Sequence, residues 1–183
     1  MMKIDAKGYM SEVKFISSPN YDERPLESEI NLLVIHSISM PPDVFEGNGV
    51  IDLFTNQLNS DLTCYQSVRG LKVSSHFFIR RNGEIIQFVS CDKRAWHAGK
   101  SFWKGRENCN DFSVGVEMEG SDTTPFSEDQ YLSLVTLTIE LSKAYPIIDI
   151  IGHSDIAPKR KTDPGPHFDW CYFEKALLIA KQG

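Results

Sequence analysis

Ile147-Ile-Asp-Ile-Ile-Gly-His-Ser-Asp-Ile-Ala-Pro-Lys-Arg-Lys-Thr-Asp-Pro-Gly-Pro166 joins a short branched apolar run to a proline-stiffened loop. The loop carries His153, Lys161 and Asp163, and a second apolar run far upstream, Asn31-Leu-Leu-Val-Ile-His36, also ends on a histidine. Short apolar runs of this kind are typical of buried strands, predicted here at 32–36 and 147–151. Because residues at strand ends are held by rigid backbone, His36 and His153 are candidates for a chemical site.

The three side chains His36, His153 and Asp163 match a common zinc ligand set. Two imidazoles and a carboxylate typically hold a catalytic zinc ion that keeps one position open. Pro164 disfavours a helical backbone at Asp163, and alternate residues of an extended segment point the same way, so Lys161 should project beside Asp163. Each residue also has a simpler interpretation: a hydrogen-bonded structural histidine, or a tight turn at Asp163-Pro-Gly-Pro.

The stretch 111–119 alternates and is predicted to be a strand. One face carries Phe112, Val114, Val116 and Met118, and the other carries Ser113, Gly115, Glu117 and Glu119. A carboxylate beside a zinc site can take the proton of an attacking water, and Lys161 could stabilise the resulting oxyanion. Alternation does not choose between Glu117 and Glu119, and a solvated strand face would look the same.

The remaining pattern predicts a mixed α/β fold, in which helices flank a central mixed sheet. Asn82-Gly83 between the runs 73–80 and 84–89 is a strong hairpin signal. Ser127-Glu-Asp-Gln130 is a capping box that opens a helix ended by Pro146, and 168–181 forms a closing helix. The long segment 37–72, with a short helix near 50–57, is predicted to be a lid or binding loop.

Composition places the chain among single-domain globular proteins, with one domain over residues 1–183. A net charge of −6 with scattered basic residues argues against nucleic acid as a partner. We expect no membrane span, no secretory signal and therefore a cytoplasmic location. We also expect a monomer and four free thiols, at Cys64, Cys91, Cys109 and Cys171.

Several blocks of the chain resemble the N-acetylmuramoyl-L-alanine amidases of the amidase-2 superfamily, which includes peptidoglycan recognition proteins. These blocks are Val34-Ile-His36-Ser, Ser75-His76-Phe-Phe-Ile, Ala95-Trp-His-Ala-Gly99, Asn110-Asp-Phe-Ser-Val-Gly-Val-Glu117-Met-Glu-Gly and Gly152-His-Ser-Asp-Ile-Ala-Pro. Within the superfamily, Asp92-Lys-Arg-Ala-Trp-His-Ala-Gly99, Gly105-Arg-Glu-Asn-Cys-Asn-Asp111 and Lys161-Thr-Asp-Pro-Gly-Pro-His-Phe-Asp-Trp170 look like the AmpD type, the cytoplasmic anhydro-muropeptide amidases of cell-wall recycling.

The resemblance implies a Zn²⁺ ion held by His36, His153 and Asp163, with Glu117 as the base or water-orienting residue and Lys161 stabilising the transition state. It implies cleavage of the amide between the lactyl group of 1,6-anhydro-N-acetylmuramic acid and L-alanine. Residues 37–72 would then cover the substrate, an anhydro-muropeptide.

Four further residues are predicted to bind substrate. Trp96 could stack on a sugar, and His97 could line the cleft or orient a ligand. Arg69 and Arg106 could pair with peptide carboxylates, because a guanidinium matches a carboxylate bidentately. Each of these residues could instead be structural or solvated.

Three other functions are less consistent with the sequence. An amidase acting on intact peptidoglycan is disfavoured by the absence of a secretory signal. A non-catalytic muropeptide-binding module is disfavoured because the ligand set is complete together with Glu117 and Lys161. A generic zinc peptidase is disfavoured because the sequence has no His-Glu-x-x-His motif.

Overall fold

The centre of the fold is a six-stranded mixed sheet, seen in a computed structural model that describes residues 2–59 and 61–182. All neighbouring strands are parallel except the antiparallel hairpin β4–β5. The strands, in sheet order, are β1 (Lys14–Phe15), β5 (Ile85–Gln87), β4 (Phe77–Ile79), β9 (Ser113–Glu119), β3 (Leu32–Ile38) and β10 (Asp149–Gly152). The predicted mixed sheet is therefore confirmed.

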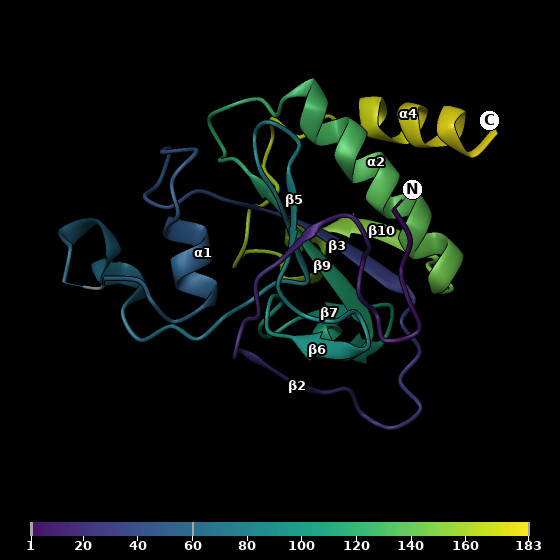
Figure 1. Cartoon of the computed structure of the whole chain (residues 1–183), viewed down its shortest axis with the longest axis horizontal. Helices are drawn as coiled ribbons and strands as arrows, with labels where there is room; N and C mark the ends of the chain where they lie inside the picture. The colour runs from purple at the N-terminus through teal and green to yellow at the C-terminus, as the bar shows by residue number, and fades with distance from the viewer. Residues whose placement is uncertain (1, 60, 183) are drawn as a thin grey trace.

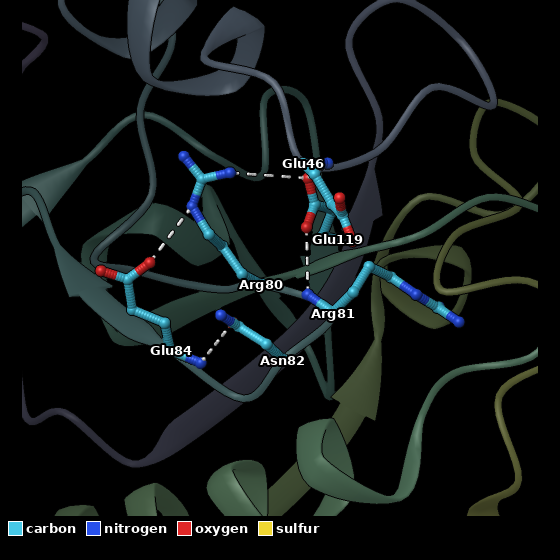
Figure 2. Close-up of a pocket in the computed structure, with 6 residues that line it drawn as sticks. All are labelled: Glu46, Arg80, Arg81, Asn82, Glu84 and Glu119. Atoms are coloured by element: carbon cyan, nitrogen blue, oxygen red, sulfur yellow. Dashed lines mark hydrogen bonds and ion pairs between the residues drawn. The ribbon is translucent and has the colours of Figure 1, made fainter.

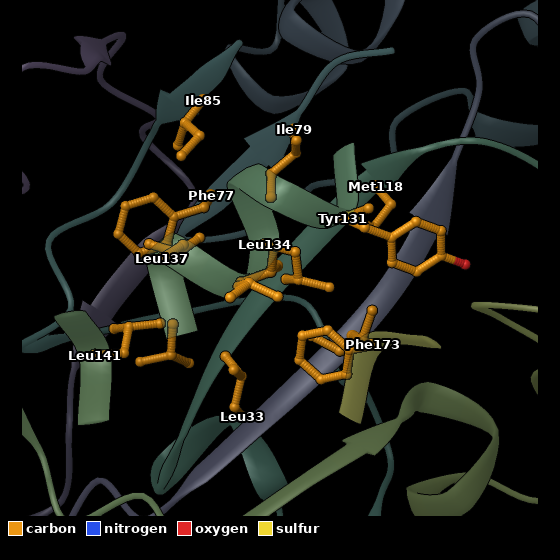
Figure 3. Close-up of a cluster of buried hydrophobic side chains, with 14 of the residues drawn as sticks. Leu33, Phe77, Ile79, Ile85, Met118, Tyr131, Leu134, Leu137, Leu141 and Phe173 are labelled. Atoms are coloured by element: carbon orange, nitrogen blue, oxygen red, sulfur yellow. The ribbon is translucent and has the colours of Figure 1, made fainter. Parts of the chain in front are cut away.

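Helices α2 (Glu128–Ala144) and α4 (Trp170–Gln182) lie side by side over one face of this sheet (Figure 1). Figure 3 shows the apolar layer between these two helices and the sheet, to which α2 contributes Leu134 and Leu137 and α4 contributes Phe173. Burial of this layer is the main stabilising contribution to the fold, because removing apolar surface from water is favourable.

The opposite face of the sheet carries shorter elements and the long segment 37–72. Helix α1 (Gly49–Phe54) lies there (Figure 1). Its Leu53 and Phe54 belong to one buried apolar cluster with Phe78 and Ile86 of the sheet. The other short elements are β2 (Tyr21–Glu23), η1 (Thr63–Val68), β6 (Lys93–Ala95), β7 (Phe102–Trp103), β8 (Arg106–Glu107), η2 (Cys109–Asp111) and α3 (His153–Ile156). Residue 60, within the predicted lid, lies outside the described residues.

The local signals in the sequence account for most element boundaries. Ser127 caps α2 and forms the predicted capping box with Gln130, and α2 ends just before Pro146. The β4–β5 turn closes through a hydrogen bond from the Gly83 amide to the Arg80 carbonyl, with Gly83 at φ +81°. Only glycine adopts that backbone without strain. The four cysteines are free, as predicted, and no helix of the described ranges is long and apolar enough to cross a membrane.

Two expectations need correction. Phe112 precedes β9 and packs with Leu32 and Val34 on the opposite face from Val114, Val116 and Met118. The alternation breaks there because η2 and its cap at Phe112 interrupt the extended backbone. The stretch after β10 is also not all loop, because its first residues form the helical turn α3.

Candidate metal centre

The pairing of β3 with its two parallel neighbours brings the chemical side chains together. Gly152 of β10 pairs with Ile35, so His153, the next residue, lies beside His36. His36 itself pairs with Glu117 of β9. Residues paired in a parallel ladder point to the same face, so His36 and Glu117 face the side away from α2. The strand continues to Ile38, so His36 lies within it and not at its end.

Three ligand atoms from His36, His153 and Asp163 converge on one point. The two Nδ1 atoms of the histidines are 2.9 Å apart, and Asp163 Oδ2 lies 3.1 Å from His36 Nδ1 and 3.0 Å from His153 Nδ1. Both histidines are buried and Asp163 is partly buried. The structure thus brings together the three residues predicted as ligands.

This triangle of atoms suits a zinc ion. Ligand atoms bound tetrahedrally to zinc at about 2.0–2.1 Å are roughly 3.3 Å from one another, a few tenths of an ångström more than these atoms are. Burial lowers the pKa of His36 to about 4, so its imidazole is neutral at neutral pH, which is the form that binds a metal. Two imidazoles and a carboxylate also match the donor types that zinc prefers.

Glu117 adds an unpaired carboxylate oxygen beside these ligands. It is 8 % exposed, and its Oε2 is buried without a hydrogen-bond partner. Burial and the nearby charge of Asp163 raise the pKa of Glu117 well above its usual range, while Lys161 opposes the rise. A buried acceptor without a partner is costly, so its presence here fits a site that binds a polar group or a cation.

Glu119, the other candidate base, has a different environment. Its carboxylate accepts hydrogen bonds from the backbone amides of Glu46 (2.8 Å) and Arg81 (3.0 Å), and it lies 3.9 Å from Arg80 (Figure 2). These residues line a separate cavity of about 390 Å³. The structure therefore distinguishes the two carboxylates that alternation could not: Glu117 faces the ligand cluster, and Glu119 is a satisfied structural acceptor.

A cavity of about 240 Å³ opens beside the ligand cluster. Lys161, Asp163, Glu117 and Trp96 line it, as do apolar side chains of the segment 37–72, among them Leu53. The predicted binding segment thus forms one wall of the cavity. Whether that segment moves stays a prediction.

The other predicted substrate contacts lie in different settings. His97 lines the cavity, but both of its ring nitrogens are within hydrogen-bonding distance of protein groups. Arg69 is exposed and lies 3.7 Å from Asp61, and the Arg106 guanidinium stacks 3.6 Å from the Phe112 ring centroid. Neither arginine is among the described residues that line the cavity. Their roles stay predictions.

Sequence reasoning missed two residues that hold the site together. Arg160 donates from Nη2 to the carbonyls of Ala98 (2.7 Å) and Lys100 (2.8 Å), and it comes from the same loop as Lys161. The Asn110 side chain accepts from the amides of His97 (3.2 Å) and Ala98 (2.8 Å). Both residues lie inside sequence blocks that had been singled out, but backbone partners of this kind leave no pattern in the sequence.

A mixed sheet with a His-His-Asp cluster and a buried carboxylate on the face away from α2 defines a candidate metallohydrolase. The sequence profile of the N-acetylmuramoyl-L-alanine amidase family, Amidase_2, matches residues 26–166. The chain belongs to this amidase family and is of the AmpD type within it.

The relatives match over nearly the whole chain. The 1,6-anhydro-N-acetylmuramyl-L-alanine amidase AmpD of Enterobacter cloacae is 48% identical over 176 residues, which cover 94% of each chain. A crystal structure of a selenomethionine AmpD derivative superposes with a TM-score of 0.92 at 47% identity, covering 96% of this chain and 99% of that one. The Escherichia coli amidase AmiD, solved with anhydro-N-acetylmuramic acid-L-Ala-D-gamma-Glu-L-Lys, has a TM-score of 0.60 at 27% identity, covering 95% of this chain and 65% of that one.

Proposed function

We propose that this amidase is zinc-dependent and hydrolyses the amide bond between the lactyl group of 1,6-anhydro-N-acetylmuramic acid and L-alanine of muropeptides, in peptidoglycan recycling. The observation that carries the proposal is the convergence of His36 Nδ1, His153 Nδ1 and Asp163 Oδ2 beside the unpartnered oxygen of Glu117. The substrate is inferred from the AmpD relatives, which are similar over almost the full chain.

His36, His153 and Asp163 would hold the zinc ion. When bound, zinc would polarise the scissile carbonyl and lower the pKa of a water molecule. The residues of the site supply the other catalytic functions. The buried His36 imidazole is neutral and needs no deprotonation to act as a ligand, and the apolar side chains that 37–72 contributes to the cavity wall lower the local dielectric, which strengthens electrostatic interactions.

Glu117 is proposed as the general base. It takes a proton from the attacking water, whose oxygen forms a bond to the lactyl carbonyl carbon. It then returns that proton to the nitrogen of L-alanine as the C–N bond breaks; the second proton of the water passes to the same amine, leaving a lactyl carboxylate and an ammonium group. Lys161, an exposed cation that lines the same cavity, is proposed to stabilise the oxyanion.

Trp96 is the strongest candidate for a sugar contact, because it is half-buried and lines the cavity. His97, Arg69 and Arg106 remain proposed substrate contacts. An aromatic ring buries much apolar area against a sugar face, whereas the arginines would reach the carboxylates of the stem peptide. We further propose one domain over residues 1–183, a monomer, a cytoplasmic location, and neither nucleic acid nor membrane as a partner.

The test measures products and metal on one protein sample. The zinc content is determined first, and anhydro and non-anhydro muropeptides and intact sacculi are then offered separately. Mass spectrometry should detect free stem peptide released from the anhydro-muropeptide. Addition of a chelator should abolish this release. Preferential release from sacculi would favour a peptidoglycan-degrading amidase instead, and full activity without metal would refute the mechanism.

A further inference from the structure

A buried line of hydrogen bonds runs from His36 into the protein interior. His36 Nε2 lies 2.9 Å from His97 Nδ1, and His97 Nε2 lies 3.2 Å from Ser113 Oγ. Ser113 Oγ in turn donates to the Cys109 carbonyl at 2.6 Å. The four residues are each less than a tenth exposed, so these contacts are largely shielded from solvent.

The Cys109 carbonyl determines which atom is the donor in each hydrogen bond of this line. A carbonyl only accepts, so at 2.6 Å the single hydroxyl proton of Ser113 must lie between the two oxygens. Ser113 Oγ therefore accepts from His97, whose proton is on Nε2. His97 Nδ1 is then a lone pair that accepts from His36 Nε2–H. His36 Nδ1 is left unprotonated, and it points at the metal centre.

His153 is oriented by the residue next to His97. Its Nε2 lies 3.0 Å from the Ala98 carbonyl, which only accepts, and 3.4 Å from Arg160 Nη2; a neutral His153 that offers its Nδ1 to a metal therefore carries its proton on Nε2, toward Ala98. The Asn110 side chain holds the backbone amides of His97 and Ala98. One rigid dipeptide thus sets the tautomer of both histidine ligands.

Strand β9 is shaped to admit the His97 ring. A Cβ added at Gly115 would lie 2.5 Å from His97 Cγ and 2.6 Å from its Nδ1, closer than real contacts allow. A glycine in a strand interior usually marks such a close approach. Gly115 and Ser113 lie on the same face of β9 as Glu117, so one strand carries the proposed base and supports the ligand.

We propose that His97 is a positioning residue for the metal centre: it accepts the Nε2 proton of His36 and so keeps His36 Nδ1 free to bind zinc. This inference rests on the proposed zinc site. Because both ring nitrogens of His97 are engaged in this line, any contact of His97 with the substrate would be made by its ring carbons. Without His97 as acceptor, the proton of His36 would move to Nδ1 and donate to Asp163, which lies 3.1 Å away.

The first measurement uses the metal-free wild-type protein, so it does not depend on the zinc proposal. Long-range ¹H–¹⁵N correlation spectra of the imidazoles report which nitrogen carries the proton. We expect the Nε2–H tautomer for His36, His97 and His153. A proton on Nδ1 of His36 in the wild type would overturn the inference.

The second measurement compares two replacements of His97. His97→Phe keeps a ring against Gly115 but removes the acceptor, and we expect zinc affinity to fall roughly 10- to 100-fold, as for other groups that orient metal ligands. His97→Asn restores an acceptor oxygen at the position of Nδ1 and should recover most of that loss. Ser113→Ala, which removes only the hydroxyl, should weaken zinc binding in the same direction but less.

The control is His167→Phe, the same replacement at an exposed histidine outside the site. It should leave the zinc affinity unchanged. Equal zinc affinity of the wild type, His97→Phe and His97→Asn, each with a cooperative unfolding transition, would refute the positioning role. If the wild type binds no zinc while His36 shows Nε2–H, the zinc proposal fails but the tautomer assignment stands.

Discussion

Replacing Glu117 by glutamine should make the enzyme slower and its metal-free form more stable. The amide keeps the size of the side chain but removes the charge of a buried carboxylate, one oxygen of which has no hydrogen-bond partner. The same carboxylate is the proposed base. Opposite effects on rate and stability are expected when a group is held in an unfavourable environment for the sake of chemistry.

The size of both effects follows from the environment of Glu117. Loss of a general base slows a reaction by about 100-fold or more, equivalent to at least about 2.7 kcal/mol in the barrier. Burying a carboxylate with one oxygen unpaired costs at least about 1–3 kcal/mol, and the loss of its charge sets the expected gain of the variant at pH 8. Because the pKa of Glu117 is raised in the folded protein, wild-type stability falls as the pH rises above the ordinary glutamate value, about 4.3. The gain should therefore shrink toward zero below that pH.

The assay combines urea unfolding of metal-free protein at several pH values with product formation by the zinc-loaded enzyme. Glu119→Gln is the matched control, two residues along the same strand face. Its carboxylate accepts two backbone hydrogen bonds, so this variant should lose about 1.5–3 kcal/mol and keep its rate. A slower Glu119→Gln enzyme beside an unimpaired Glu117→Gln would show that the wrong carboxylate was chosen. A destabilised Glu117→Gln would contradict the unpaired state of Glu117.

Four further outcomes are expected. Lys161→Ala should lower kcat with little change in KM, as measured by steady-state kinetics, because the lysine acts on a charge present only in the transition state. Gly115→Ala should destabilise the fold by about 1–3 kcal/mol in denaturant unfolding, since its methyl group would overlap the His97 ring. Chelation should abolish amidase activity and added zinc should restore it; activity that persists in the chelator would argue against a metal. Limited proteolysis within 37–72 should slow when an anhydro-muropeptide is bound, and equal cleavage with and without ligand would count against a moving lid.

The convergence of His36, His153 and Asp163 could be predicted because each lies on or just after a segment with a strong local signal. The two apolar runs identified the strands. The short segment from His153 to Asp163 limited the possible distance between the Asp163 carboxylate and the His153 ring. The capping box at Ser127 and the turn at Gly83 were equally local, and both are present.

The features that could not be predicted from the sequence depend on contacts between segments that are distant along the chain. Strands of two or three residues, such as β1 and β6, are too short for a periodic pattern, and their pairing is set by the tertiary fold. Alternation could not separate Glu117 from Glu119, because the difference lies in neighbours contributed by other loops. The roles of Ser113 and Gly115 could not be predicted for the same reason. A serine and a glycine on a small-residue face have no pattern that predicts contact with the His97 ring.

The pairing of β3 with β10 has a consequence for the order in which the protein matures. The ligands come from residue 36 and from residues 153 and 163, so the growing chain cannot assemble the cluster until residue 163 has left the ribosome. A cation captured there would tie β3 to a segment that is synthesised 117 residues later. Acquisition of the metal would then mark chains whose outermost parallel strand has docked, and unfinished or truncated copies would remain catalytically silent.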